Sequence, residues 1–261
     1  MIFFVQAGSF IARVFANGRE QVFHGREEGQ KMIRMTKENS WVLTAVLLTI
    51  VTTVSCSKGY NKHAEEYYAQ GKIFYENMEY GRSIDSFSKV LELAPAGEEN
   101  NRIYYMRGRS YLKDRQYDKA IYDFSKALEL TGEGDKNLRF LILEMRGDAY
   151  SGKNTWVNAI QDYSVALTLQ WEHENAKYVY LNRGWAFLNN GDLEPAIKDF
   201  TKAISIDSKL AEAYYGRGTA WLNKRDLQRA LEDAKEALKL KPDVAKYDDF
   251  VYEISSGTKR K

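Results

Sequence analysis

Cysteine, histidine and proline are scarce in this sequence, and each scarcity excludes a class of protein. Cys56 is the only cysteine among 261 residues, so no intramolecular disulfide, zinc ribbon or iron–sulfur cluster can form. Neither His63 nor His173 has a second histidine at the spacing of a zinc-binding helix, and no G-x-x-x-x-G-K-S/T phosphate loop is present. With 3 prolines and 18 glycines, the chain is neither collagen-like nor of low complexity. We expect a protein that is not an enzyme and that uses no cofactor, metal ion or small-molecule substrate.

An excess of charge of either sign is also missing. The chain has 38 Lys and Arg against 36 Asp and Glu, a formal net charge of +2. Without a domain-wide positive field there is little to hold a phosphate backbone, so we expect no nucleic-acid partner. Aromatic residues, in contrast, are plentiful: 18 Tyr, 12 Phe and 5 Trp are enough to build a substantial core.

An uncharged apolar segment lies near the N-terminus, at residues 41–54. As a helix it would rise only about 21 Å, short of the ~30 Å hydrocarbon core, but it fits the apolar region of a secretion signal. Arg34 and Lys37 precede it, and Val54-Ser55-Cys56 follows it. This arrangement resembles the lipobox of bacterial lipoproteins. The alternative is an uncleaved short anchor with an incidental cysteine.

The lipobox resemblance implies a division of the N-terminal part. Residues 32–55 are interpreted as the signal peptide, Cys56 as the lipidated mature terminus, and residues 56–63 as a short tether. The protein is then expected to be exported and anchored by its lipid to a membrane of the bacterial envelope, with the outer membrane favoured. Residues 1–31 are too long for the basic start of such a signal. We interpret them as an over-extended reading frame, with translation starting at Met32 or Met35.

Beyond residue 60 the sequence repeats itself. Five segments carry a glycine followed three residues later by an aromatic residue: Gly71/Phe74, Gly108/Tyr111, Gly147/Tyr150, Gly184/Phe187 and Gly218/Trp221. Twelve residues after each glycine stands a small residue: Ser83, Ala120, Ala159, Ala196 and Ala230. Four residues further on are Phe87, Phe124, Tyr163, Phe200 and Ala234. The apolar residues in each half recur at helical spacing, so each repeat is expected to be a helical hairpin. A glycine inside a helix costs about 1 kcal/mol, so its recurrence indicates close backbone approach between the two helices.

This pattern resembles the tetratricopeptide repeat, in which an aromatic residue, a glycine and a tyrosine precede an alanine and a phenylalanine. The leading aromatic residues are Tyr67, Tyr104, Tyr180 and Tyr214, and the terminal proline is present as Pro95 and Pro242. The resemblance implies an all-α, right-handed superhelical solenoid of five hairpins over residues 64–243. The repeats are expected to start near residues 64, 101, 140, 177 and 211, with a capping helix and basic tail at 244–261.

The arginines that precede four of the glycines form a second repeated feature: Arg107, Arg146, Arg183 and Arg217. Their constant register favours packing of the side-chain stems, with the guanidinium groups near solvent or a neighbouring carboxylate.

The resemblance also implies that a protein or peptide ligand lies along the concave surface of the first helices. The side chains expected to line this groove are Tyr68, Lys72, Tyr105, Arg109, Lys113, Tyr178, Leu181, Trp185 and Tyr215. The third repeat places acidic residues there, Glu144 and Asp148, and Trp185 is the expected anchor. The Lys, Asn and Arg set with which chaperone-binding members hold a terminal carboxylate is not reproduced. The alternative is that these side chains pack only against neighbouring helices.

Two functions fit these expectations. The first is a non-enzymatic protein–protein interaction scaffold, a lipid-anchored adaptor of the bacterial cell envelope. The second is a structural or surface-exposed lipoprotein that acts by self-association or host contact.

Overall fold

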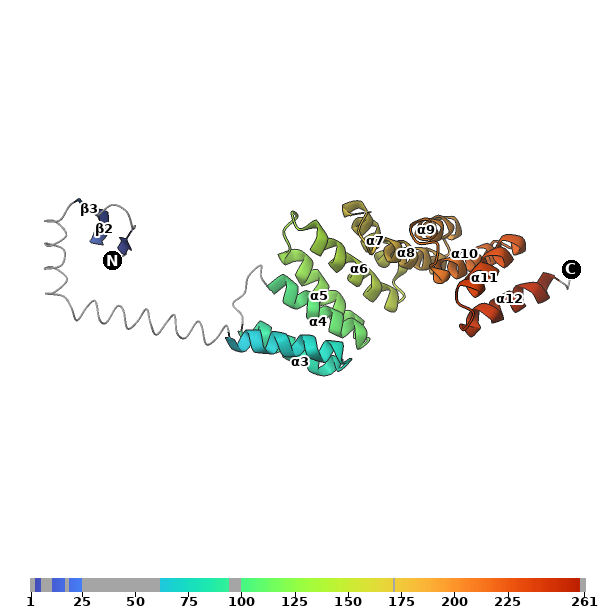
Figure 1. Ribbon diagram of the computed structural model, residues 1–261, viewed down its shortest axis with the longest axis horizontal. Coiled ribbons are helices and arrows are strands. Elements are labelled where there is room, and N and C mark those ends of the chain that lie inside the picture. The colour runs from blue at the N-terminus through green and yellow to red at the C-terminus, as the bar shows by residue number, and fades with distance from the viewer. Residues whose placement is uncertain are drawn as a thin grey trace. The chain divides into compact units, whose positions relative to one another are not determined.

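The computed structural model describes residues 3–5, 11–16, 19–24, 62–93, 100–170 and 172–258, and the chain divides into two units, Met1–Lys62 and His63–Lys261. The first unit contains three strands, β1 (Phe3–Val5), β2 (Ile11–Ala16) and β3 (Arg19–His24), in an antiparallel sheet of order β1-β2-β3 (Figure 1). Phe3 pairs with Val14, and Ile11 pairs with His24. These strands were not expected from the sequence. The apolar segment, Cys56 and most of the expected tether lie outside the described residues.

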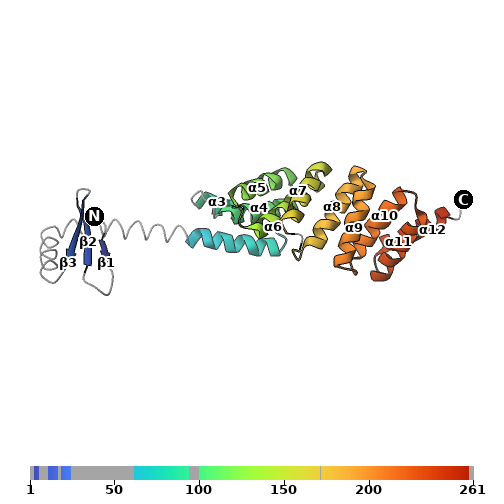
Figure 2. The ribbon, with the colours of Figure 1, turned by 90° about the horizontal axis from the view of Figure 1, so that it is seen from above.

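The second unit is a stack of helical hairpins, and the expected all-α solenoid is confirmed for it. In Figure 2 the hairpins follow one another from α3 to α12. Its helices are residues 62–76, α3 (Tyr80–Leu93), α4 (Asn101–Lys113), α5 (Tyr117–Leu130), α6 (Lys136–Gly152), α7 (Trp156–Leu169), α8 (Ala176–Asn190), α9 (Leu193–Ile206), α10 (Ala211–Asn223), α11 (Leu227–Leu240) and α12 (Ala245–Thr258). Within the described residues this gives five hairpins and a final single helix.

The hairpin turns share one backbone feature. Seven residues after each repeat glycine, one residue adopts a left-handed conformation: Met78, Arg115, Asn154, Gly191 and Arg225, with φ from 58° to 91°. Only the fourth turn uses glycine, the residue that adopts this conformation without steric cost. The other four turns keep the same geometry with side chains that are less favourable there, because the flanking helices fix the position of both ends of the turn.

The repeat glycines make room for aromatic rings. A Cβ atom added at Gly71, Gly108 or Gly184 would lie 2.8–2.9 Å from a ring carbon of the phenylalanine on the second helix of the same hairpin. At Gly147 the ring is that of Tyr163, at 2.5 Å. The sequence predicted a close approach of the two backbones at these glycines. At these four positions the nearest atoms instead belong to an aromatic side chain, which the absent Cβ allows to lie flat on the first helix.

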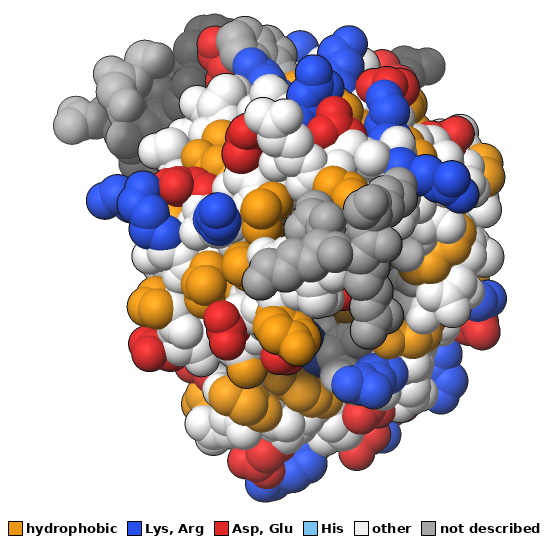
Figure 3. All heavy atoms as spheres, turned by 90° about the vertical axis from the view of Figure 1, so that its right-hand side faces the viewer, with side chains coloured by type: hydrophobic (Ala, Val, Ile, Leu, Met, Phe, Trp, Pro, Cys, Tyr) orange, Lys and Arg blue, Asp and Glu red, His pale blue; other side chains and the backbone are white. Residues whose placement is uncertain are grey.

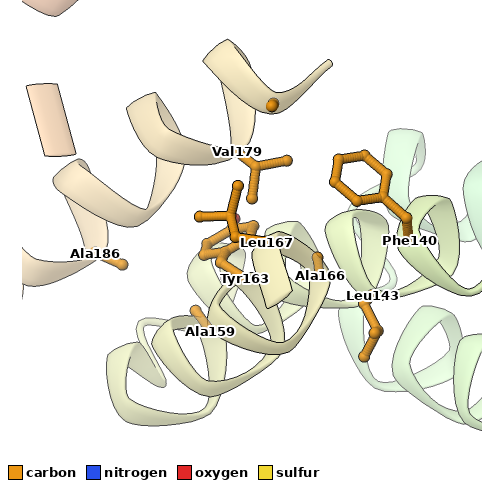
Figure 4. Close-up of a cluster of buried hydrophobic side chains, with 9 residues drawn as sticks. Phe140, Leu143, Ala159, Tyr163, Ala166, Leu167, Val179 and Ala186 are labelled. Atoms are coloured by element: carbon orange, nitrogen blue, oxygen red, sulfur yellow. The ribbon is translucent and has the colours of Figure 1, made fainter. Parts of the chain in front are cut away.

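The core is a series of such ring contacts. Phe87, Phe124, Tyr163 and Phe200 are all fully buried, as are the alanines that precede them by four residues in the second to fourth repeats. In Figure 4, Tyr163 and Leu167 of α7 point toward Val179 of α8, so the ring of one hairpin also contacts the next hairpin. This contact pattern makes stacking obligatory, because no hairpin can bury its own apolar face alone.

The last helix completes the fifth repeat. Ala234 stands where the other repeats carry an aromatic ring, and Phe250 of α12 is the side chain nearest to a Cβ added at Gly218, at 3.1 Å. Phe250 and Ile254 are buried against Ala234. The expected capping helix is therefore present and supplies the ring that the fifth repeat lacks. Figure 3 views the C-terminal side of the molecule, where charged side chains of both signs are scattered among hydrophobic ones.

Candidate functional site

The first helices of the hairpins form a continuous row. α4 contacts α6, α6 contacts α8, and α8 contacts α10, whereas each second helix packs mainly between two first helices. The first helices therefore line the inner side of the stack, which we call the inner face. The positions expected to face it are three residues before and one residue after each repeat glycine.

A ladder of arginine–aspartate pairs occupies the other edge of the first helices. Each arginine donates two hydrogen bonds, from Nε and Nη2, to the aspartate 16 residues later, at 2.7–2.9 Å. Its Nη1 atom donates to a hydroxyl of the preceding hairpin. The four sets are Arg107, Asp123 and Ser88; Arg146, Asp162 and Ser125; Arg183, Asp199 and Ser164; and Arg217, Asp233 and Thr201.

This ladder confirms the structural interpretation of the repeated arginines. Each pair joins the two helices of one hairpin, and the third hydrogen bond joins that hairpin to the preceding one. The first repeat has Gln70 and Ser86 at the two positions, so it lacks both members of the pair. These arginines are committed to packing and are not candidates for ligand binding.

The N-terminal part of the inner face is basic and aromatic. The Lys72 ammonium lies over the ring of Tyr68, 5.2 Å from its centroid. The Arg109 guanidinium lies 4.6 Å from the ring centroid of Tyr75 and 5.6 Å from that of Tyr105, so it links two repeats. These positively charged groups lie on aromatic faces and keep their outer sides available to a ligand. Lys113, at the C-terminal end of α4, is exposed.

The third repeat departs from the others at three positions together. Where the other repeats have Tyr68, Tyr105, Leu181 and Tyr215, it has Glu144, which is only 4 % exposed. One turn later it has Asp148, and its core ring is Tyr163, whose hydroxyl donates to Asp148 Oδ1 at 2.6 Å. Asn182 of α8 donates to the same oxygen at 2.9 Å.

These carboxyl groups are in an unusual electrostatic environment. Burial, together with the negative charge of Asp148, raises the pKa of Glu144 to about 7, against the lowering effects of Asn175 and Arg109. Burial also raises the pKa of Asp148, although its hydrogen bonds and the charge of Lys113 lower it. Among the described residues neither carboxyl group forms an ion pair. Buried carboxyl groups without a basic partner are costly to a fold, and they are typical of binding sites.

The C-terminal part of the inner face is aromatic. Trp185 is half-buried, edge-to-face on Phe200 at 5.4 Å and tilted against Tyr215 at 5.8 Å between ring centroids. Tyr178 lies two helical turns before Trp185 and is 43 % exposed. Tyr215 also contacts Phe250 of the last helix, at 5.0 Å.

Leu181 was wrongly assigned to the groove. It is only 6 % exposed and packs with Phe200 and Ala213 between the fourth and fifth hairpins. Its neighbour Asn182, which the sequence prediction omitted, instead reaches Asp148 of α6 with its amide. The spacing from Tyr178 to Asn182 is one helical turn, so the periodicity contained a signal for Asn182. The hydrophobicity of leucine does not distinguish a groove contact from a core contact.

A cavity of about 210 Å³ lies between α6, α7 and α8. Its walls include Asp148 and Ser151 of α6, Trp156 and Tyr163 of α7, and Asn182 and Trp185 of α8. Trp156 and Tyr163 were not predicted as part of the site. In the described part of the chain, His, Cys, Asp and Glu side chains do not gather into a group able to hold a metal ion. Among the same residues, no helix has the length and apolar character needed to cross a membrane.

Comparison with protein families finds tetratricopeptide repeats in three places, at residues 102–133, 178–210 and 211–244. No curated protein matches the chain significantly. Among solved structures, MamA is similar with a TM-score of 0.59 and 22% sequence identity, covering 72% of this chain and 96% of MamA.

A MamA structure from Desulfovibrio magneticus RS-1 has a TM-score of 0.60 at 16% identity, covering 69% of this chain and 96% of that one. YrrB, described as a TPR protein with an unusual peptide-binding site, has a TM-score of 0.58 at 23% identity, covering 76% of this chain and 97% of YrrB. At these identities the likeness establishes the fold alone.

Proposed function

Because this chain belongs to the tetratricopeptide repeat family, we propose that it is a non-enzymatic scaffold that binds a peptide segment of another protein along its inner face. The observation that carries the proposal is the third repeat. Glu144 is buried at a position where the other repeats carry tyrosine or leucine, and Asp148 lies half-buried one turn later. Neither carboxyl group has an ion-pair partner in the described structure, a cost that stacking of the hairpins does not require. The peptide-binding site named for YrrB, a protein of the same fold, agrees with this proposal.

The groove is tested by capture of partners with the tagged full-length chain, using crosslinking in the intact cell and mass spectrometry. Trp185→Ala is expected to weaken binding of a captured partner by about 2 kcal/mol, or about thirtyfold in Kd, because a half-buried tryptophan in a groove is a typical hot spot. Tyr252→Ala is the matched control, since Tyr252 is 76 % exposed on α12. Helical content is measured by circular dichroism for both variants.

Equal capture by the two variants would move the binding surface to the outer side or the loops. Arg109→Glu is expected to act mainly on the association rate and its salt dependence, as a charge at the rim of an interface does.

The second part of the proposal concerns location. The apolar segment that ends at the only cysteine supports a lipid-anchored adaptor in the bacterial cell envelope, with Cys56 as the acylated residue. Cys56→Ala is expected to abolish fatty-acid labelling and to release the protein from the membrane fraction. More than one acyl chain is needed for stable anchoring, at about 0.8 kcal/mol per buried CH₂. Unchanged labelling and membrane retention in Cys56→Ala would refute the anchor and leave the scaffold proposal intact.

A structural lipoprotein that acts by self-association or host contact is the competing function. Sedimentation of the detergent-solubilised protein separates the two proposals. A stoichiometric complex with a different protein favours the adaptor, whereas a concentration-dependent homo-oligomer with no other component favours self-association.

A further inference from the structure

We propose that the cavity between α6, α7 and α8 accepts a positively charged side chain, lysine or arginine, of the bound partner peptide. This inference rests on the proposed function and names the chemistry that the inner face selects. The cavity combines one carboxylate, that of Asp148, with the indole rings of Trp156 and Trp185. A carboxylate beside aromatic faces favours a cationic ligand, through a charge-assisted hydrogen bond and cation–π attraction.

Two hydrogen bonds to one oxygen of the Asp148 carboxylate fix its orientation, and its second oxygen accepts none within the described residues. Both internal donors, the Tyr163 hydroxyl and the Asn182 amide, bind Oδ1, at 2.6 and 2.9 Å. Within the described residues no group donates to Oδ2. Tyr163 remains a neutral donor, because burial and the charge of Asp148 raise its pKa well above the usual value. The carboxylate is therefore oriented before a ligand arrives, and its second oxygen is available to an ammonium or guanidinium group.

Among the described residues, no lysine or arginine of the protein itself forms an ion pair with Asp148. Lys113 and Arg109 on α4 are close enough to influence the two carboxyl groups electrostatically, but neither forms an ion pair with them in the described structure. Arg109 lies against the rings of Tyr75 and Tyr105 instead. A carboxylate ligand is disfavoured, because the Tyr163 hydroxyl and the Asn182 amide already donate to Asp148 and the charge of Asp148 would repel the ligand.

Glu144 supplies a second negative charge one turn from Asp148. The charged and titratable groups that face it are Asp148 on its own helix, Arg109 and Tyr105 on α4, and Tyr163 on α7. Asn175, the residue before α8, donates a hydrogen bond to it. A cation in the cavity would stabilise ionised Glu144. Binding is therefore expected to strengthen as the pH rises through about 7, the pKa of Glu144.

The test uses three small probes on the full-length protein in detergent: the N-acetyl methylamides of lysine, norleucine and glutamate. Norleucine has the aliphatic chain of lysine without the ammonium group. Binding is followed by NMR at the indole NH signals of tryptophans labelled with nitrogen-15. The lysine probe is expected to bind about tenfold more tightly than the norleucine probe, as one charge-assisted contact provides, with shifts at Trp156 and Trp185.

Two aspartate variants provide the controls. Asp148→Asn is expected to remove the preference for lysine, and Asp118→Asn, at a side chain that is 81% exposed, is expected to leave it unchanged. If Asp148→Asn loses its fold, Trp185→Leu tests the aromatic wall independently, with the same expected loss of preference.

The outcomes separate this inference from the proposed function. Equal binding of the lysine and norleucine probes, or tighter binding of the glutamate probe, would overturn the cationic site, and partner capture that still depends on Trp185 would then leave the scaffold in place. Partner capture that does not depend on Trp185 would refute the groove itself, whatever the probes do.

Discussion

Replacing Gly184 by alanine tests the physical basis of the repeat. A Cβ at this position would lie 2.8 Å from Cε1 and 2.9 Å from Cδ1 of Phe200. Ordinary contacts between such atoms begin at about 3.4 Å, so the ring must move by about half an ångström or more. Phe200 is fully buried and holds Trp185 edge-to-face, so the displacement would be transmitted to the inner face.

The magnitude follows from two opposing effects. Overpacking of a well-packed core costs about 1–3 kcal/mol, and alanine in a helix is better than glycine by about 1 kcal/mol. Gly184→Ala is therefore expected to lower the free energy of unfolding by about 1 kcal/mol. Gly81→Ala is the matched control, because Gly81 lies in α3 with no atom within 4 Å of an added Cβ. It is expected to raise the free energy of unfolding by about 0.5–1 kcal/mol.

The assay is urea unfolding followed by far-UV circular dichroism, with the slope against denaturant compared between variants. Equal slopes are required, because a repeat array can lose its all-or-none unfolding and the midpoints are then not comparable. The two variants should differ by about 2 kcal/mol. A Gly184→Ala protein at least as stable as the Gly81→Ala protein would refute the view that the glycine exists to accommodate the ring.

Three further outcomes follow from the structure. Asp199→Asn leaves the half-buried Arg183 guanidinium without its charged partner and is expected to lower the free energy of unfolding by about 3 kcal/mol. Glu129→Gln, at an exposed ion pair, should change it by no more than about 0.5 kcal/mol. Both are measured by urea unfolding. Ala120→Leu inserts volume at a fully buried contact between two helices and is expected to cost about 1–3 kcal/mol in the same assay. The raised pKa of Glu144 means that the folded state binds more protons than the unfolded state between pH 4.5 and about 7. Stability should therefore fall as the pH rises through this window, by at most about 3 kcal/mol from this group, and Glu144→Gln should reduce the slope in thermal unfolding against pH.

Each of these outcomes has a contrary result. Similar urea midpoints for Asp199→Asn and Glu129→Gln would mean that the arginine ladder contributes no more than a surface ion pair. An Ala120→Leu protein as stable as the parent would mean that the two helices leave enough space at Ala120 for a larger side chain, contrary to the structure. A slope in pH that is the same in Glu144→Gln as in the parent would assign the titration to another group.

The repeat itself was predictable from the sequence because its determinants are local and periodic. The glycine, the small residue and the aromatic ring recur at constant spacing, and helical periodicity places them on the same side of each hairpin. Only the packing role of the repeated arginines was predictable, and their hydrogen-bond partners were not. The register of Arg107 and its equivalents indicated packing, but the partner 16 residues away and the hydroxyl of the preceding hairpin depend on how neighbouring helices lie together.

The composition of the site was decided by the tertiary structure. Periodicity alone does not tell which of Leu181 and Asn182 lies on the inner face, because the boundary depends on the angle at which the next hairpin covers α8. The cavity requires residues from α6, α7 and α8, and Tyr163 belongs both to the core and to the binding surface. Phe250 of α12 supplies the aromatic ring that the fifth repeat lacks at Ala234. The sequence determined each hairpin through short-range spacing, whereas contacts between hairpins, which no local pattern encodes, determined which side chains a partner can reach.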